Sequence, residues 1–174
     1  DTETSSLDPH QAELIGVSLC SRIGKACYIP IGHNSKKCIN KDIVIKKLKP
    51  LLEDPSIKKI GQNIKFDFIV LFKHGINITS MEDTMLMSYV LDAGKNRHNM
   101  DTLSEIHLGH KTISFKDLVG SGKKEINFSE VDIEKAKDYA AEDADITFRL
   151  YKKFSKNLKD EKMVSIYEVF EKPM

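Results

Sequence analysis

Tyr139 and Asp143 form the first pair of side chains in this sequence whose types and spacing could do chemistry. They are four residues apart within a helical pattern, so a phenol and a carboxylate would share one face of a helix, one turn apart. The small alanines between them would leave that face open to another part of the molecule, whereas Glu142 and Asp145 would point elsewhere. Taken alone, the stretch is better explained as an alanine-rich surface helix with solvated acids. Its interpretation therefore depends on which residues the rest of the chain brings to it.

Three other acids stand in unusual settings. Asp1 and Glu3 belong to a strand-like segment, and residues two apart on a strand project to the same side. Two carboxylates side by side repel each other unless a cation holds them, although a polar strand end before a turn would also explain the pair. Asp67 lies among Phe66 and Phe68, where a carboxylate is costly unless it is paired or binds a metal. The alternative is that Asp67 lies on the exposed face of an amphipathic helix.

The composition is that of one globular domain with no strong overall charge. The chain has 174 residues, of which 40% are hydrophobic and 30% are charged, with a net charge of +1. Contact with nucleic acid would therefore have to be local, or metal ions would have to offset the acids. Basic residues cluster in one part of the sequence, at Arg97, Lys111, Lys116, Lys123 and Lys124. Either a solvated loop or a local basic surface would explain this cluster.

Cysteines, histidines and hydropathy exclude several other classes of protein. Cys20 and Cys27 could face each other across a hairpin, but three cysteines without CxxC spacing favour free thiols in a reducing cytosol. None of the six histidines pairs with another at the spacing of zinc ligands. The sequence shows neither an apolar run long enough to cross a bilayer nor a secretory signal, so we expect a cytoplasmic protein without a membrane partner.

The order of the expected elements predicts an α/β domain. A strand end and a hairpin come first, followed by helices that alternate with short strands. The expected strands are residues 1–4, 14–20, 26–31, 57–60 and 77–79. The expected helices are residues 43–52 (capped by Asn40 or Asp42), 64–72 (ended by Gly75), 85–91 (capped by Asp83), 100–108 and 133–151 (capped by Asp132). We expect residues 109–122 to form a partly mobile basic segment, and catalytic groups to gather at strand ends and first helical turns.

Three stretches of the sequence resemble, in the same order, the exonuclease motifs of a known family. They are DTETSSLD at residues 1–8, GQNIKFD at residues 61–67 and YAAEDAD at residues 139–145. They resemble the 3′–5′ proofreading domain of bacterial DNA polymerase I, a family A polymerase in the tyrosine-bearing branch of the DEDD nucleases. The resemblance includes residues 97–103 and 111–115 and covers nearly the whole chain. It implies an RNase H-like fold, with a mixed β-sheet flanked by α-helices.

The resemblance also implies the activity and the roles of five side chains. We expect a metal-dependent 3′–5′ exonuclease that hydrolyses the phosphodiester at the end of single-stranded or frayed DNA. Two divalent ions (Mg²⁺ or Mn²⁺, or Zn²⁺ at one site), about 3.5–4 Å apart, would supply the chemistry, and hard ions of this kind prefer carboxylate ligands. Asp1 would bridge the ions, Glu3 and Asp143 would complete one site, and Asp67 would serve the other. Tyr139, assisted by Glu3, would orient the attacking water.

Five further residues match substrate-contacting positions of that family. Leu7 and Phe115 would wedge and stack against the terminal bases, where stacking on an aromatic ring contributes on the order of 1–3 kcal/mol. Gln62, Asn63 and Arg97 would contact the 3′-terminal nucleotide or its phosphates. The alternatives are helix capping for Asn63 and an exposed surface charge for Arg97.

The chain starts on a strand end without methionine, so we expect a fragment of a longer polymerase: a single exonuclease domain over residues 1–174, without the polymerase region. Its expected partners are the 3′ end of single-stranded DNA and the polymerase region of the same full-length chain. We expect a monomer in the bacterial cytoplasm, associated with the nucleoid.

One rival is an RNase D-like exonuclease acting on RNA, which the residues after Ser6 and those at 111–115 disfavour. The other is a catalytically silent module, which the presence of all five catalytic side chains disfavours.

Overall fold

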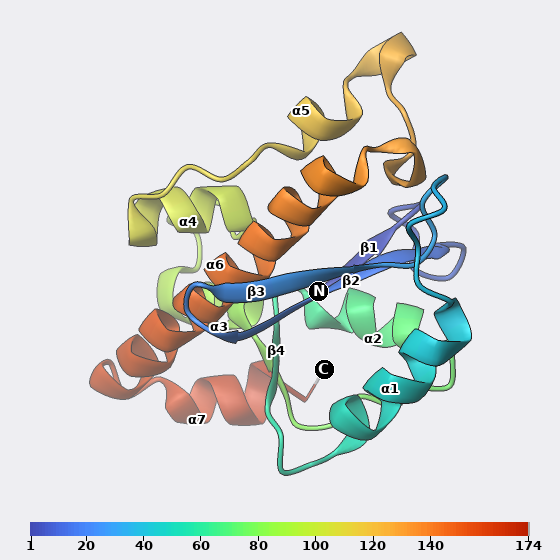
Figure 1. Ribbon diagram of the computed structural model, residues 1–174. Helices are drawn as coiled ribbons and strands as arrows, with labels where there is room; N and C mark the ends of the chain where they lie inside the picture. The colour runs from blue at the N-terminus through green and yellow to red at the C-terminus, as the bar shows by residue number, and fades with distance from the viewer. Residues whose placement is uncertain (174) are drawn as a thin grey trace.

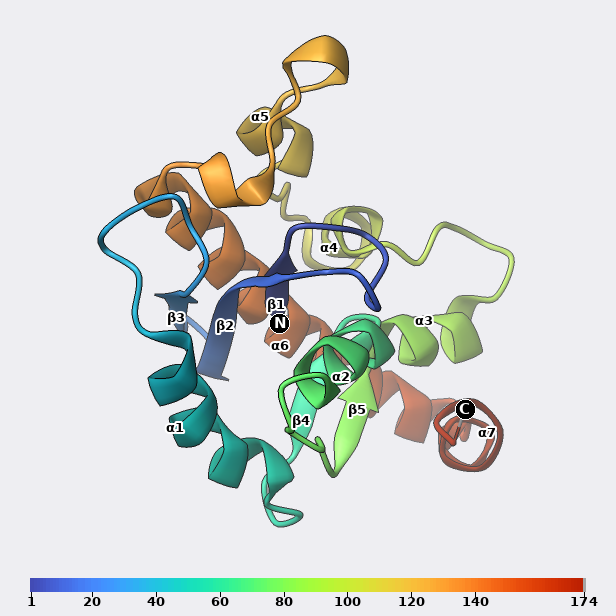
Figure 2. The same cartoon turned by 90° about the vertical axis from the view of Figure 1, so that its right-hand side faces the viewer.

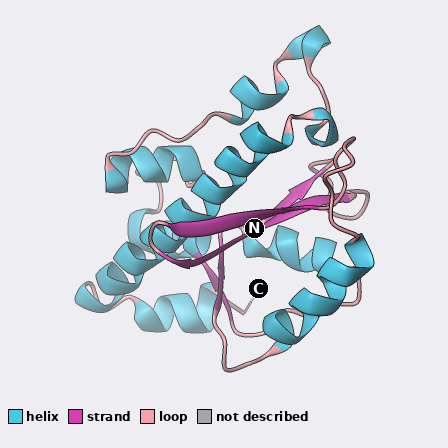
Figure 3. Ribbon diagram, in the orientation of Figure 1, coloured by secondary structure: helices cyan, strands magenta, loops and turns pink. Residues whose placement is uncertain are grey.

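The computed structural model describes residues 1–173, in which helices surround two small sheets (Figures 1 and 3). Met174, the last residue of the expected domain, and the side chain of Lys123 lie outside the described part. The strands are β1 (Thr2–Thr4), β2 (Leu14–Arg22), β3 (Lys25–Pro30), β4 (Lys59–Gly61) and β5 (Met81–Asp83). The helices are α1 (Lys41–Glu53), α2 (Ile64–Phe72), α3 (Thr84–Asp92), α4 (Met100–Leu108), α5 (Phe115–Val119), α6 (Ile133–Asp160) and α7 (Val164–Ile166). The short turns are η1 (Gly122–Lys124), η2 (Phe128–Glu130) and the π-helical η3 (Tyr167–Glu171).

Strand β2 is the centre of the first sheet and pairs antiparallel with β1 on one side and β3 on the other. The expected hairpin is confirmed, and its turn contains Gly24 with a φ of 74°, a conformation that glycine adopts without steric cost. Cys20 lies opposite Ala26 rather than Cys27. All three cysteines are free thiols.

The second sheet consists of β4 and β5 in parallel. The expected strand at residues 77–79 is wrong, because these residues are tied to the end of α1 instead. The Thr79 amide donates to the Leu52 carbonyl, and its hydroxyl donates to that of Glu53. The chain then turns at Ser80, with a φ of 52°, and the strand begins at Met81. The α/β class is confirmed, with antiparallel and parallel strands divided between two sheets.

Helix α6 lies along one face of the first sheet, and α1 and α2 lie on the other (Figures 1 and 2). Side chains on α6 are buried at intervals of three or four residues, as expected for one apolar helical face. Ala140 and Ala144 are among them, so the small residues of this helix pack against the domain. Helices α3 and α4 pack on α6 farther along its length.

The ends of the helices follow the expected sequence signals. The Asn40 side chain caps α1 by accepting from the amides of Asp42 and Ile43. Gly75, with a φ of 76°, closes α2 in a Schellman arrangement: its amide donates to the Phe72 carbonyl, and the following amide donates to Leu71. Within residues 1–173, no helix is long and apolar enough to cross a membrane.

Asp83 caps two helices at once. Its side chain accepts from the Met85 amide at the start of α3, as expected. It also accepts from the amides of Asn63 and Ile64 at the start of α2, each at 3.0 Å. One buried carboxylate therefore holds the first turns of both helices beside the end of β5.

Candidate active site: a cluster of acids at the edge of β1

Asp1, Glu3 and Asp143 each offer a carboxylate oxygen within 4.8 Å of the others. The Asp1 amino group donates to the Ser18 carbonyl at 3.0 Å, and the Ser18 amide donates to the Asp1 carbonyl at 2.9 Å. Asp1 therefore continues the register of β1, and its side chain projects to the same side as that of Glu3. Helix α6 brings Asp143 to this pair from the other end of the sequence. The expected pairing of Asp1 with Glu3 is confirmed.

Asp67 is buried in the first turn of α2, with only 5% of its surface exposed. Its Oδ1 accepts from the Thr2 amide at 2.8 Å and from the Thr2 hydroxyl at 2.6 Å. The alternative of an exposed helix face is therefore wrong for this residue. The two hydrogen bonds hold α2 against β1 and keep Asp67 beside the other acids.

The acids are crowded, and their ionisation is strongly perturbed. Burial, together with the charge of Asp143, raises the pKa of Glu3 to about 8. Burial raises the pKa of Asp143 to about 7, although a hydrogen bond from Tyr139 opposes the shift. Burial also raises the pKa of Asp67. Carboxylates that share a buried site without enough positive charge favour protonation or a bound cation.

One buried atom without a hydrogen-bond partner favours a bound cation over protonation of the acids. The buried Oε1 of Glu3 has no hydrogen-bond partner within residues 1–173, although buried polar atoms are nearly always paired. It lies in a cluster whose donors are all carboxylate oxygens. Such donors suit hard divalent cations such as Mg²⁺ and Mn²⁺. The residues present therefore fit a metal site.

Tyr139 faces this cluster from α6, one turn before Asp143. Burial, and then the charges of Asp143 and Glu3, raise the pKa of its phenol above the ordinary value. The phenol therefore stays protonated near neutral pH and can donate a hydrogen bond. Its ring lies 6.0 Å from that of Phe115 and 6.2 Å from that of Phe128, measured between centroids.

Tyr28 lies near Glu3, and Gly16 makes room for its ring. Gly16 lies opposite Glu3 in the β1–β2 register, and a β-carbon there would come within 2.1 Å of the Tyr28 hydroxyl. The Tyr28 ring can therefore cross β2 only because residue 16 is glycine. The Tyr28 hydroxyl lies 2.6 Å from His33 Nε2, which fixes the ring beside the acids.

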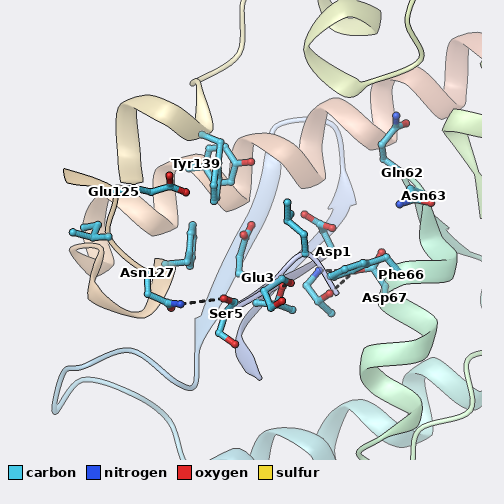
Figure 4. A pocket seen from close by; sticks show the side chains of 17 residues that line it. Asp1, Glu3, Ser5, Gln62, Asn63, Phe66, Asp67, Glu125, Asn127 and Tyr139 are labelled. Atoms are coloured by element: carbon cyan, nitrogen blue, oxygen red, sulfur yellow. Dashed lines mark hydrogen bonds between the residues drawn. The ribbon is translucent and has the colours of Figure 1, made fainter. Parts of the chain in front are cut away.

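A cleft of about 680 Å³ opens over the acids. In Figure 4, Asp1 and Glu3 lie between Tyr139 and Glu125 on one side and Gln62 and Asn63 on the other. The cleft is lined by residues 1–7, 62, 63, 66, 67, 115, 125–128 and 139. Asn127 donates to the Ser5 carbonyl at 3.0 Å, which joins the loop after β1 to the opposite wall (Figure 4).

Four of the five expected substrate-contacting residues line this cleft. Leu7 is 93% exposed, and the Phe115 ring stacks on Phe128 with an interplanar angle of 2°. The Asn63 side chain makes no capping hydrogen bond, although its residue begins α2. The Gln62 amide is engaged within the protein, because it donates to the His98 carbonyl and accepts from the Thr84 hydroxyl.

The structure places Arg97 apart from the other expected contacts. It is exposed in the loop between α3 and α4 and is not among the residues that line the cleft. The expected mobile basic segment also differs, because residues 115–119 form α5. This short helix carries Phe115 to the wall of the cleft.

Three residues that position the acids or the walls of the cleft were not predicted from the sequence. Thr2 holds Asp67 through its backbone and its hydroxyl, and an ordinary threonine in a strand gives no sign of this. Asn127 is part of an N-x-x-E capping box that starts η2, which the sequence does display. Gly16 within an apolar strand was a usable signal of close packing, here by Tyr28.

Comparison with known proteins gives a consistent result. Residues 1–159 match the family described as 3′-5′ exonuclease. DNA polymerase I of Pseudomonas aeruginosa is 46% identical over 87% of this chain and 17% of its own length. DNA polymerase I of Rhizobium leguminosarum is 43% identical over the whole chain and 19% of its own length. A similar solved structure, Brucella melitensis NrnC with bound Mg²⁺, is 28% identical with a TM-score of 0.73, over 97% of this chain and 76% of that one. This chain thus spans about a fifth of the length of these polymerases.

Proposed function

Because the chain belongs to the family of 3′–5′ exonuclease domains of DNA polymerase I, we propose that it removes nucleotides from the 3′ end of single-stranded or frayed DNA. The observation that carries the proposal is the cluster of Asp1, Glu3 and Asp143, with oxygens within 4.8 Å of one another. Asp67 and Tyr139 face the same cleft. Together they are the five side chains that we propose carry out the hydrolysis.

The four carboxylates are the proposed ligands of two divalent ions. We propose Mg²⁺ or Mn²⁺, or Zn²⁺ at one of the two positions. Asp1, Glu3 and Asp143 would hold one ion, while Asp1 and Asp67 would hold the other. When bound, such ions lower the pKa of water and stabilise the charge that develops on the phosphate and on the departing 3′ oxygen.

The remaining side chains would orient the attacking water and hold the terminal nucleotides. Tyr139, protonated because its pKa is raised, would donate to the attacking water or to the phosphate and so orient the attack. Phe115, Leu7 and Asn63 line the cleft where the terminal nucleotides would lie. Stacking on Phe115 tolerates any base, which suits an enzyme that removes whichever nucleotide is at the end.

The proposal is tested with Asp67→Ala and Asp143→Ala in the presence of Mg²⁺. Each variant should degrade a labelled single strand at least about a hundredfold more slowly, since each loses a ligand of ions that contribute several kcal/mol. Glu134→Ala is the matched control, because that acid is exposed in the first turn of α6, more than two helical turns before Asp143. Full activity in either variant would refute the assignment of these residues.

Two arms of the same assay address the rival functions. A DNA strand and the matching RNA strand are compared, and faster cleavage of RNA would favour the RNase D-like alternative. Binding without cleavage at saturating Mg²⁺ or Mn²⁺ would favour a silent module. In the longer protein, we propose that residues 1–174 form one domain beside a polymerase region in the bacterial cytoplasm, and that this region delivers the 3′ end.

A further inference from the structure

Glu142, next to the expected ligand Asp143, points away from the acid cluster and holds a different segment. Its Oε1 lies 2.8 Å from His110 Nε2, and its Oε2 accepts from the Ile113 amide at 2.6 Å. Both oxygens of one carboxylate are thus engaged by residues 110–113. Hydrogen bonds to a charged acceptor are among the stronger ones in proteins.

The same segment is tied to α4 on its other side. The Ser104 hydroxyl donates to the His110 carbonyl at 2.8 Å, and the Thr112 hydroxyl donates to Asp101 at 2.6 Å. Residues 110–113 therefore form a strap between α4 and α6. The strap is mostly exposed, so these polar contacts, rather than burial, determine where it lies.

The strap ends two residues before Phe115, the first residue of α5. Helix α5 has only five residues, and its C-terminal end is fixed by Val119, which is buried in the cluster that includes Phe128 and Ala136. The position of its first residue, Phe115, therefore also depends on the segment that leads into the helix. The Phe115 ring lies 6.1 Å from Phe128 and 6.0 Å from Tyr139, so a displaced strap would move this wall of the cleft away from Tyr139.

We propose that Glu142 is a positioning residue for the terminal base: by holding residues 110–113 against α6, it sets the distance between Phe115 and the acids around Asp143. The inference rests on the proposed function and assigns a role to an acid that the motif resemblance leaves without one. Glu142 and Asp143 are consecutive on one helical turn, so they face about 100° apart. One turn of α6 therefore carries both a ligand for the ions and the anchor of the wall that holds the base.

The test compares two single-stranded DNA substrates in Mg²⁺, one ending in thymidine and one ending in an abasic residue. For the unmodified protein, KM should be about tenfold lower for the thymidine end, because stacking contributes on the order of 1–3 kcal/mol. In Glu142→Ala this ratio of KM values should fall close to one, whereas kcat should change less. Glu142→Gln keeps an acceptor for one of the two donors and should give an intermediate ratio.

Asp145→Ala is the matched control. Asp145 is an acid on the same turn, but it accepts from the Gly24 amide in the hairpin and from Arg149 Nε. The Asp145→Ala substitution removes one negative charge near Asp143, as Glu142→Ala does, but it leaves the contacts of residues 110–113 intact. Its ratio of KM values should equal that of the unmodified protein.

A second readout does not require activity. The sequence contains no tryptophan, so Phe115→Trp introduces a single tryptophan at the wall of the cleft, whose emission can be excited selectively in the presence of the tyrosines. In this background, Glu142→Ala should shift the emission to longer wavelength, as the ring loses its contact with Phe128 and Tyr139. Thermal melting by circular dichroism checks that each variant is folded.

The outcomes separate this inference from the proposed function. An unchanged KM ratio and unchanged emission in folded Glu142→Ala would overturn the positioning role. An equal loss of kcat on both substrates with the ratio preserved would also overturn it, because the effect would then act through Asp143. If the unmodified protein cleaved neither substrate, the proposed function would fail, while the emission would still report whether Glu142 holds the wall.

Discussion

The charge of Glu3 is strongly constrained by its surroundings. Its pKa is raised from 4.5 to about 8 by burial and then by the charge of Asp143. The folded chain therefore binds this proton more tightly than the unfolded chain does. The resulting stability is fully present below pH 4.5 and is lost as the pH rises to about 8.

Without divalent ions, the free energy of unfolding should therefore fall as the pH is raised from 5 to 8. Glu3→Gln carries no charge and should flatten this dependence. At pH 8 it should melt about 3 °C or more above the unmodified protein, as expected for about 1 kcal/mol in a domain of this size. Thermal melts with EDTA and with Mg²⁺ provide the measurement. Mg²⁺ should stabilise the unmodified protein more than the variant, and equal stabilisation of both would contradict a role for Glu3 in binding the metal.

The sequence predicts the four acids of the site but not the residues that position them. Asp1, Glu3, Asp67 and Asp143 were recognisable because carboxylates in strand and apolar settings are unusual and match a motif. The burial of Asp67 could not be derived from its neighbours alone, since its partner is the amide of a residue 65 positions away.

At the scale of elements, Asp83 is the most connected capping residue. It accepts from three backbone amides at the starts of α2 and α3, and α2 carries Asp67. Asp83→Ala should lower the free energy of unfolding by about 3 kcal/mol, because a helix cap contributes about 1 kcal/mol and buried amides would lose their acceptor. Urea denaturation measures the change.

Asn40→Ala is the control for this prediction. Asn40 caps only α1, and its residue is exposed. Its loss should cost about 1 kcal/mol and leave exonuclease activity unchanged, whereas Asp83→Ala should also reduce activity by moving α2. Similar losses of unfolding free energy in Asp83→Ala and Asn40→Ala would show that Asp83 does not stabilise α2 in addition to α3.

The sequence predicted that the longer elements exist better than it predicted the short ones or the ends of helices. The helix at residues 100–108 was correct to the residue, whereas the helix expected at 133–151 continues to Asp160. The strand expected at 77–79 was misplaced, because its residues have suitable propensity but their hydrogen bonds go to α1. Helix α5 was missed because its five residues give too short a pattern.

At the scale of the whole molecule, charge distribution predicts how DNA binding responds to salt. The net charge is only +1, and none of the described residues that line the cleft is lysine or arginine. We expect contacts with about three phosphates, and so a slope of about −2 for the logarithm of the binding constant against that of salt concentration. Anisotropy of a labelled single strand on the Asp143→Ala variant measures it. A slope steeper than about −5 would reveal a basic surface that the cleft does not show.

The site also depends on the whole chain, which explains why no single stretch could establish it. Glu3 and Asp143 come from the first strand and the last long helix, yet their oxygens lie within 4.8 Å. Local patterns predict that each element exists but not which faces meet. Only the match to three ordered motifs indicated, from sequence, that these acids converge.

The hydrogen bond from the Thr2 amide to Asp67 makes strand β1 a reporter of the site. Strand β1 lies at the edge of its sheet, and amide protons of an edge strand that have no partner usually exchange quickly with solvent. The Thr2 amide is instead buried and bound to a buried carboxylate, so it should persist in deuterated water like an amide of the core. Its nitrogen and proton resonances should also move when Asp67 gains a proton or a cation. A single backbone signal would then follow the occupancy of the cleft in solution.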